Sequence, residues 1–208
     1  MRKWLKVLAV EILVLIWISE FNVSILISFL WIILHEAAHI LVAQKFGCKF
    51  NNVKIGILGA NAELIDLDEQ SDRNRLLIYL AGPCFNLFIA VCMHCIYQYF
   101  NYDFFYNSMI VNLCLGAFNL LPAYPLDGSR IFEILLSKKF LYKKSKEITE
   151  IISFTISGVL FLLFNIMLLL HKVNITLFLA SILMGYTTFW EKEKTMYIIM
   201  GDMVKKVR

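Results

Sequence analysis

The sequence predicts an all-α polytopic membrane protein, with about six transmembrane helices and a small membrane-associated β-hairpin between the second and the third. Composition is the first reason: 60% of the 208 residues are hydrophobic and the mean hydropathy is +0.70, whereas an average soluble domain is roughly 45–50% apolar. The second reason is that the apolar residues fall in long runs, interrupted by only three prolines, and many runs approach the ~20 residues needed to cross a bilayer core.

The apolar runs define the predicted spans. They cover residues 4–19, 21–46, 76–100, 105–121, 148–170 and 174–190. The first and the fourth are short for a bilayer crossing, so we expect helix tilt or local thinning there. Basic residues precede the first run, as in a signal peptide, but no small-residue cleavage site follows it, so we expect a retained helix.

The segment at about 48–72 differs in character from the spans on either side. Residues 53–66 contain two short β-prone stretches with a Gly-Ala-Asn turn between them, which predicts a β-hairpin. Open strand edges cannot face lipid, so we expect the hairpin at the membrane interface or packed against protein. Its edge would be suited to pairing with an unwound peptide.

The basic residues predict the topology. If both termini are cytoplasmic, all of the 20 Lys and Arg residues except Lys172 lie on the inner side, as the positive-inside tendency requires. We therefore expect a multi-pass integral membrane protein with both ends in the cytoplasm. One intramembrane domain would occupy residues 1–190, and residues 191–208 would form a short basic tail.

Charge and cysteine content argue against other classes of protein. The net charge is +4, but the basic residues stand at the ends of apolar runs without interleaved exposed aromatics, so we predict no nucleic-acid partner. Five cysteines, mostly inside apolar runs, do not suit a disulfide framework. The Cys92-Met93-His94-Cys95 string has no second ligand pair, so we expect packing there and no metal.

The second predicted span contains His35-Glu36-Ala37-Ala38-His39. Residues four apart share one face of a helix, so both imidazoles can reach one metal ion while Glu36 lies beside a water on that metal. This is the arrangement that zinc-assisted peptide hydrolysis needs. A solvated helix face is the ordinary alternative, but a charge placed centrally in a span costs about 2.5–3.5 kcal/mol, which favours a bound partner.

A catalytic zinc usually takes three protein ligands and a water, so a further ligand is needed. Asp127 is the candidate, because Pro122 and Pro125 prevent regular helix just before it. Irregular backbone at membrane depth is tolerated only where it lines a protein cavity. The second and fourth spans run in the same direction, so we expect the histidines and Asp127 at similar depth. Taken alone, Pro-x-Leu-Asp-Gly is equally typical of a turn.

Three motifs in this order resemble those of the site-2 proteases, which are intramembrane zinc metalloproteases. They are His35-Glu36-x-x-His39, Gly82-Pro83-x-x-Asn86 and Asn119-x-x-Pro122-x-x-Pro125-x-Asp127-Gly128. The resemblance extends from the second span through Arg130. It implies that Zn²⁺ is bound by His35, His39 and Asp127, that Glu36 is the catalytic base, and that Asn86 and Asn119 bind the substrate backbone or stabilise the oxyanion.

The small size, with no room for a PDZ insertion, is most similar to the stage IV sporulation protein FB branch of that family. The likeness implies a bacterial membrane and a membrane-associated protein substrate, with a sigma-factor precursor in sporulation as one example. It also implies a regulatory membrane protein as a further partner. Some members of the branch carry a C-terminal CBS domain, and we expect none within these 208 residues.

Two other functions stay open on the sequence. A metal or ion transporter would use the same His, Glu and Asp side chains as a transport site. Transporters often show internal repeats and paired broken helices, whereas this sequence shows one broken region and no repeat. A catalytically inactive membrane adaptor is the third reading, and the intact Glu36 argues against it.

Overall fold

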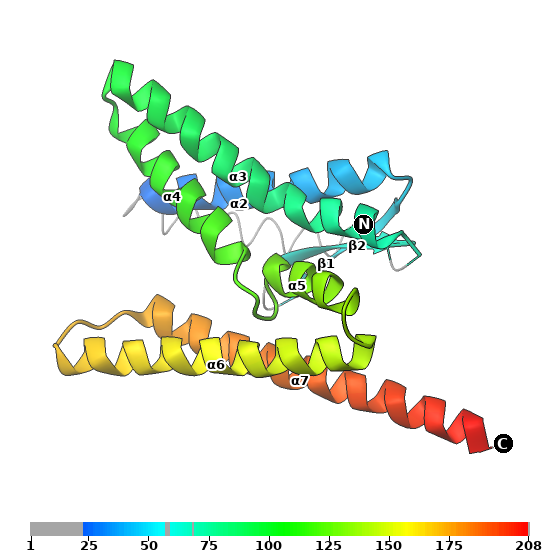
Figure 1. Cartoon of the computed structure of the whole chain (residues 1–208). Coiled ribbons are helices and arrows are strands. Elements are labelled where there is room, and N and C mark those ends of the chain that lie inside the picture. The colour runs from blue at the N-terminus through cyan, green and yellow to red at the C-terminus, as the bar shows by residue number, and fades with distance from the viewer. Residues whose placement is uncertain (1–22, 57–58, 68, 208) are drawn as a thin grey trace. The chain divides into compact units, whose positions relative to one another are not determined.

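The structure, a computed structural model, describes residues 23–56, 59–67 and 69–207 (Figure 1). The first predicted span, at 4–19, lies outside the described residues. The described part contains helices α2 to α7 and one pair of strands. The chain divides into two compact units, residues 1–118 and residues 119–208.

The first unit begins with α2, Val23–Lys45, which carries both histidines of the predicted site. One stripe of this helix is buried and repeats every four residues; it consists of Ile27, Trp31, His35, His39 and Ala43. The helix ends at Gly47, whose φ of 84° is left-handed. The Cys48 N–H then bonds to the Ala43 carbonyl at 3.0 Å and the Gly47 N–H to the Gln44 carbonyl at 2.9 Å, a Schellman motif that ends the helix and turns the chain.

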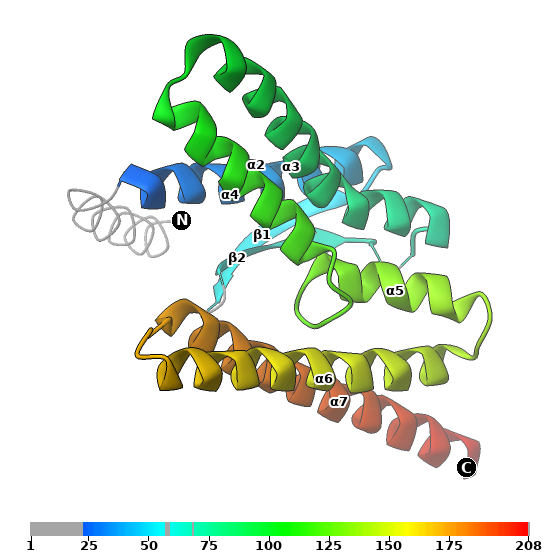
Figure 2. The ribbon, with the colours of Figure 1, turned by 60° about the vertical axis from the view of Figure 1, so that its left-hand side comes forward.

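Strands β1, Lys49–Gly56, and β2, Gly59–Ile65, follow immediately. They pair antiparallel from Lys49 opposite Ile65 to Gly56 opposite Gly59, with an irregularity between Phe50 and Asn52. This two-stranded sheet lies in the segment for which the sequence predicts a hairpin, and both ribbon views show it (Figure 2).

Helices α3, Asp72–Phe100, and α4, Asp103–Asn119, complete the first unit. Ser71 caps α3 by accepting a hydrogen bond from the Asn74 N–H at 3.3 Å, which is the usual role of a serine at this position. Asn101, with a left-handed φ of 51°, ends the helix. The two helices then run antiparallel (Figures 1 and 2).

The second unit contains α5, Asp127–Ser137, α6, Tyr142–Leu169, and α7, Ile175–Val207. Helices α6 and α7 form an antiparallel pair, joined midway by a hydrogen bond from Ser157 Oγ to the Ser181 carbonyl at 2.7 Å. Helix α7 continues through residue 190 without interruption.

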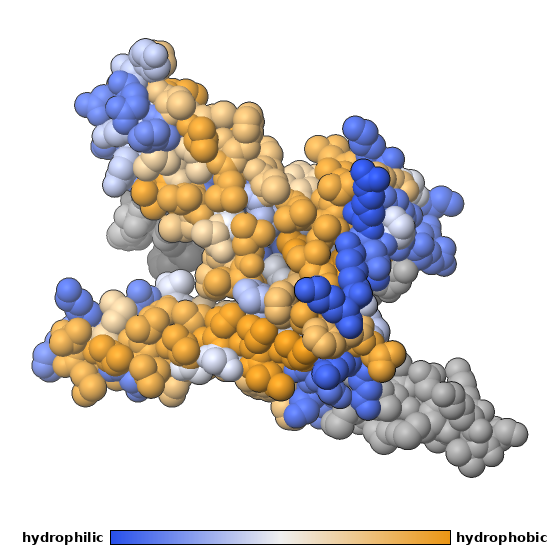
Figure 3. All heavy atoms as spheres, in the orientation of Figure 1, coloured by the Kyte–Doolittle hydropathy of each residue, from blue (hydrophilic) through white to orange (hydrophobic). Residues whose placement is uncertain are grey.

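Three of the described helices are long and apolar enough to cross a membrane. They are Ile27–Lys45 of α2, Asp72–Phe100 and Tyr142–Leu169. Helix α4, with 17 residues, is shorter than these. Figure 3 shows apolar side chains along the visible faces of α3, α4 and α6, and hydrophilic side chains at the helix ends. Exposed large apolar residues on α6, among them Ile151, Phe154 and Leu162, form a face suited to lipid.

Candidate metal centre

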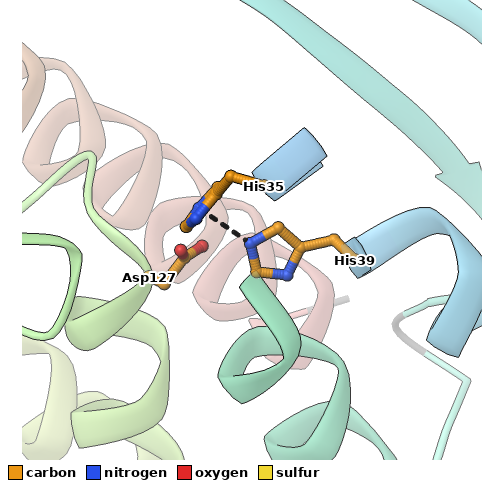
Figure 4. A group of neighbouring side chains, drawn as sticks. All are labelled: His35, His39 and Asp127. Atoms are coloured by element: carbon orange, nitrogen blue, oxygen red, sulfur yellow. Dashed lines mark hydrogen bonds between the residues drawn. The ribbon is translucent and has the colours of Figure 1, made fainter. Parts of the chain in front are cut away.

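His35 and His39 lie one helical turn apart on the buried stripe of α2, and their rings meet. Their side chains belong to residues that are only 4% and 9% exposed. The two Nε2 atoms are 3.1 Å apart, and the ring planes are inclined at 78° (Figure 4). Within the first unit, the two imidazoles therefore lie side by side.

The orientation of His39 is set by the backbone of α3. Its Nδ1 lies 2.7 Å from the Ile78 carbonyl oxygen, and a carbonyl can only accept, so Nδ1 carries the proton. The neutral imidazole then presents a lone pair at Nε2, the atom that faces His35. A hydrogen bond of this kind from the second ring nitrogen is what usually holds a metal-binding histidine in place.

The geometry of the two nitrogens fits one zinc ion. In a tetrahedral site with Zn–N distances of about 2.0–2.1 Å, two ligand nitrogens are separated by roughly 3.3 Å. The observed Nε2 separation of 3.1 Å is close to that value. Two buried imidazoles of this orientation therefore offer the paired donor atoms of a zinc site without rearrangement of the helix.

Gly82 on α3 is what allows the two rings to fit against that helix. A Cβ at Gly82 would stand 2.3 Å from His39 Nε2 and 2.7 Å from His35 Nε2, separations that no side chain tolerates. The next residue is Pro83, within α3. Proline has no N–H to donate to the carbonyl four residues earlier, and its ring crowds the preceding helical turn. Ile78, whose carbonyl holds His39, belongs to that preceding turn.

Glu36 occupies the helical position between the two histidines in sequence and is half-buried. On an α-helix it is displaced by about 100° from His35 and about 60° from His39, so its Cβ flanks the face from which the imidazoles project. Inside a predicted span, a carboxylate in this position requires polar surroundings. A water bound to a metal at the two histidines would be such a neighbour.

Asp127 is the first residue of α5, in the second unit, and it is half-buried. The loop before it is a compact turn, with the Leu126 N–H donating to the Ala123 carbonyl at 2.9 Å. A carboxylate in the first turn of a helix is favoured by the helix dipole. His35, His39 and Asp127 each offer one ligand atom of a type that zinc accepts, and Figure 4 draws the three side chains.

The two predicted asparagines differ in their surroundings. Asn86, one helical turn after Gly82, is 0% exposed, and among the described residues neither its Oδ1 nor its Nδ2 has a hydrogen-bond partner. A buried amide left in this way costs about 1–3 kcal/mol, and a ligand or an ordered water is among the partners that would remove that cost. Asn119 is the last residue of α4 and is half-buried.

The sequence predicts no role for two contributors to the His pair, the Ile78 carbonyl and Gly82, although Gly82 belongs to one of the three motifs. The Ile78 carbonyl is a backbone atom, and no residue type signals its role. Gly82 has a sequence signal, because it lies four residues before Asn86 and immediately before Pro83. That spacing puts Gly82 and Asn86 on one face of α3.

Comparisons with known proteins agree with this chemistry. The profile of Peptidase family M50 matches residues 23–104 and 101–164. The chain is 32% identical, over 95% of its length, to a zinc metalloprotease of Methanocaldococcus jannaschii. It is 24% identical, over 70% of its length, to Stage IV sporulation protein FB of Bacillus subtilis. The chain spans 58% and 54% of the lengths of these two relatives.

The fold is also similar to a solved structure. It is the structure of a site-2 protease from Methanocaldococcus jannaschii, and the TM-score is 0.65 at 30% sequence identity. The similarity covers 88% of this chain and 86% of the other.

Proposed function

The chain belongs to peptidase family M50, which includes the site-2 proteases, and from this membership we propose that it is an intramembrane zinc metalloendopeptidase. The substrate is a membrane-associated protein, cut near the cytoplasmic face. The observation that carries the proposal is the buried pair His35 and His39, whose Nε2 atoms lie 3.1 Å apart in an apolar helix. Glu36 follows directly on the first of them.

Asp127 is the third zinc ligand in this proposal. Two imidazoles need one more protein ligand to make a catalytic site, and a carboxylate is a ligand type that completes a His-His set. Asp127 is half-buried at the start of α5. Its carboxylate also supplies negative charge, which would offset part of the charge of a divalent ion in a site shielded from bulk water.

Glu36 acts as the base and then as the acid. When bound, zinc would lower the pKa of a water ligand and polarise the scissile carbonyl. Glu36 accepts a proton from the attacking water and delivers it to the nitrogen of the leaving amine. Asn86 and Asn119 orient the peptide backbone or donate hydrogen bonds to the oxyanion. The buried amide of Asn86, which has no hydrogen-bond partner among the described residues, supports that role.

The arrangement in the membrane is part of the proposal. Six spans would place both termini in the cytoplasm, because nearly all Lys and Arg residues then lie inside. The β1–β2 sheet would lie at the membrane interface and pair with an extended substrate. The similarity to Stage IV sporulation protein FB supports a substrate such as a sigma-factor precursor, and a regulatory membrane protein as a second partner.

The Glu36→Gln variant tests the proposed function. Purified protein should retain about one zinc per chain, because glutamine leaves the ligands intact, while cleavage of a co-expressed membrane-tethered substrate should be lost. Cleavage by Glu36→Gln at the wild-type rate would refute the role given to Glu36. Zinc uptake into reconstituted vesicles, with no proteolysis of any substrate, would instead support a transporter.

A further inference from the structure

Tyr124, in the loop that precedes α5, is held by three separate groups of the second unit. It is 1% exposed. Its backbone N–H donates to Ser153 Oγ of α6 at 2.9 Å, and its carbonyl accepts from Thr187 Oγ1 of α7 at 3.2 Å. Its phenol hydroxyl donates to the carboxylate of Glu133 on α5. A single loop residue thus contacts all three helices of the unit.

The carboxylate that receives the phenol is itself fixed. Glu133 is 4% exposed, and Arg130 Nη1 lies 3.5 Å from its Oε2. The second terminal nitrogen of Arg130, Nη2, lies 3.1 Å from Glu191 Oε1 on α7. The guanidinium carbon Cζ lies over the Tyr124 ring, 5.2 Å from its centre. Buried charges are stable only when they are paired and hydrogen-bonded, so this group resists displacement of any one member.

The backbone between Tyr124 and Asp127 is held by hydrogen bonds and close packing. The Leu126 N–H donates to the Ala123 carbonyl at 2.9 Å, and the Ser129 N–H donates to the Leu126 carbonyl at 3.0 Å. Gly128 is packed so closely that a Cβ there would stand 2.3 Å from the Leu121 carbonyl oxygen. A shift of Tyr124 is therefore passed on to Asp127, three residues later.

We infer that Ser153 is a positioning residue for metal binding, which acts on the Asp127 carboxylate through Tyr124. The inference rests on the proposed function, since it takes Asp127 as a zinc ligand. Ser153 is fully buried at 0% exposure, and its hydroxyl oxygen accepts the hydrogen bond from the backbone N–H of Tyr124. Groups behind the direct ligands of a metal site commonly change metal affinity by about 10–100-fold.

Thr187 contributes less than Ser153 to this arrangement. Its hydroxyl has one proton, and three carbonyls compete for it: Tyr124 at 3.2 Å, Leu183 at 2.9 Å and Met184 at 3.1 Å. The two contacts within α7 are the shorter ones. We therefore expect the loop to depend mainly on Ser153, with Thr187 adding a weaker contact.

Ser157 provides the matched control. It is one helical turn from Ser153 on the same helix, is 9% exposed, and also makes a contact between helices, to the Ser181 carbonyl at 2.7 Å. Within the described part of the chain, this hydrogen bond joins α6 to α7 and does not involve the Tyr124 loop. If Ser153 simply holds α6 against α7, alanine at either position should have the same consequences.

The experiment compares Ser153→Ala with Ser157→Ala in the full chain purified in detergent, by competition for zinc with a chromogenic chelator and by thermal unfolding. Loss of one hydrogen bond of ordinary strength corresponds to a factor of about three to ten. We expect Ser153→Ala to weaken zinc affinity by that factor and Ser157→Ala to leave it unchanged, while both lower the melting temperature similarly. Equal zinc affinities in the two variants would overturn the inference.

Two further variants separate this inference from the function on which it rests. Asp127→Ala should lose most zinc affinity, and Ser153→Ala should add no further loss in that background, because it acts through Asp127. If Asp127→Ala binds zinc like the wild type, both the ligand assignment and the inference fail. If only the Ser153→Ala effect is missing, the ligand assignment stands and the positioning role fails.

Discussion

The Cα of Gly82 faces His39 so closely that a methyl group built on it would stand 2.3 Å from the imidazole Nε2. The fit of the two histidines against α3 therefore depends on a residue without a side chain. Because Asn86 follows Gly82 by four residues, the same face of α3 carries both the contact with the imidazoles and the buried amide.

Gly82→Ala should displace both imidazoles and weaken zinc binding by at least about tenfold, as does loss of a supporting contact at other metal sites. The measurement is zinc content after desalting, with affinity from chelator competition. Gly158→Ala is the control, because Gly158 lies within α6 and a Cβ there meets nothing within 4 Å. An unchanged zinc affinity in Gly82→Ala would show that the imidazoles do not need this contact.

Asn86→Ala should lower kcat on the order of a hundredfold, the effect typical of removing one oxyanion donor, while zinc content stays at the wild-type level. Stability should change by less than about 1 kcal/mol, since the variant also removes a buried amide without a partner. Cleavage kinetics and thermal unfolding are measured on the same preparation.

Asn112→Ala is the matched control for that variant. Asn112 of α4 is also 0% exposed, but its Nδ2 donates to the Ser108 carbonyl at 2.9 Å. We expect a loss of stability with kcat unchanged. If both asparagine variants reduce kcat equally, the role proposed for Asn86 in binding the peptide backbone or the oxyanion is contradicted.

Cys48 should make stability depend on pH at the alkaline end. It follows the end of α2 and packs with Ala43 and Ile78. Burial, and to a lesser extent the Asp66 carboxylate, raise the pKa of its thiol in the folded protein. The neutral thiol is thereby favoured on folding, so its stabilising effect is present below the ordinary cysteine pKa of about 8.5 and is lost as pH rises through the folded value.

The free energy of unfolding of wild type and Cys48→Ala, measured by SDS titration at pH 7 and pH 10, checks this. The advantage of the wild type should be smaller at pH 10. A difference that is the same at both pH values would mean that the thiol does not titrate differently in the folded protein.

The paired histidines and the irregular segment before Asp127 are predictable because they depend on local rules. Residues four apart share a helix face, and two prolines three apart exclude helix. Helix α5, Asp127–Ser137, was not predicted as a separate element. It has only 11 residues, and a search for membrane-crossing runs passes over amphipathic helices of that length.

The supporting contacts are not predictable in the same way. The bond from His39 to the Ile78 carbonyl and the bond from Tyr124 to Ser153 join residues 39 and 29 positions apart. In the sequence, Ser153 is one of several small polar residues inside an apolar run. Only the packing of α6 against the loop distinguishes it from Ser157.

The central claim is that His35, His39 and Asp127 bind one zinc ion. Zinc K-edge X-ray absorption of the purified full chain tests it most directly, with Asp127→Ala measured alongside. The account predicts one zinc per chain, two imidazole nitrogens and only oxygen otherwise in the first shell, with a carboxylate lost and metal content lowered in Asp127→Ala. Sulfur in the first shell, or an identical spectrum and zinc content in Asp127→Ala, would contradict it.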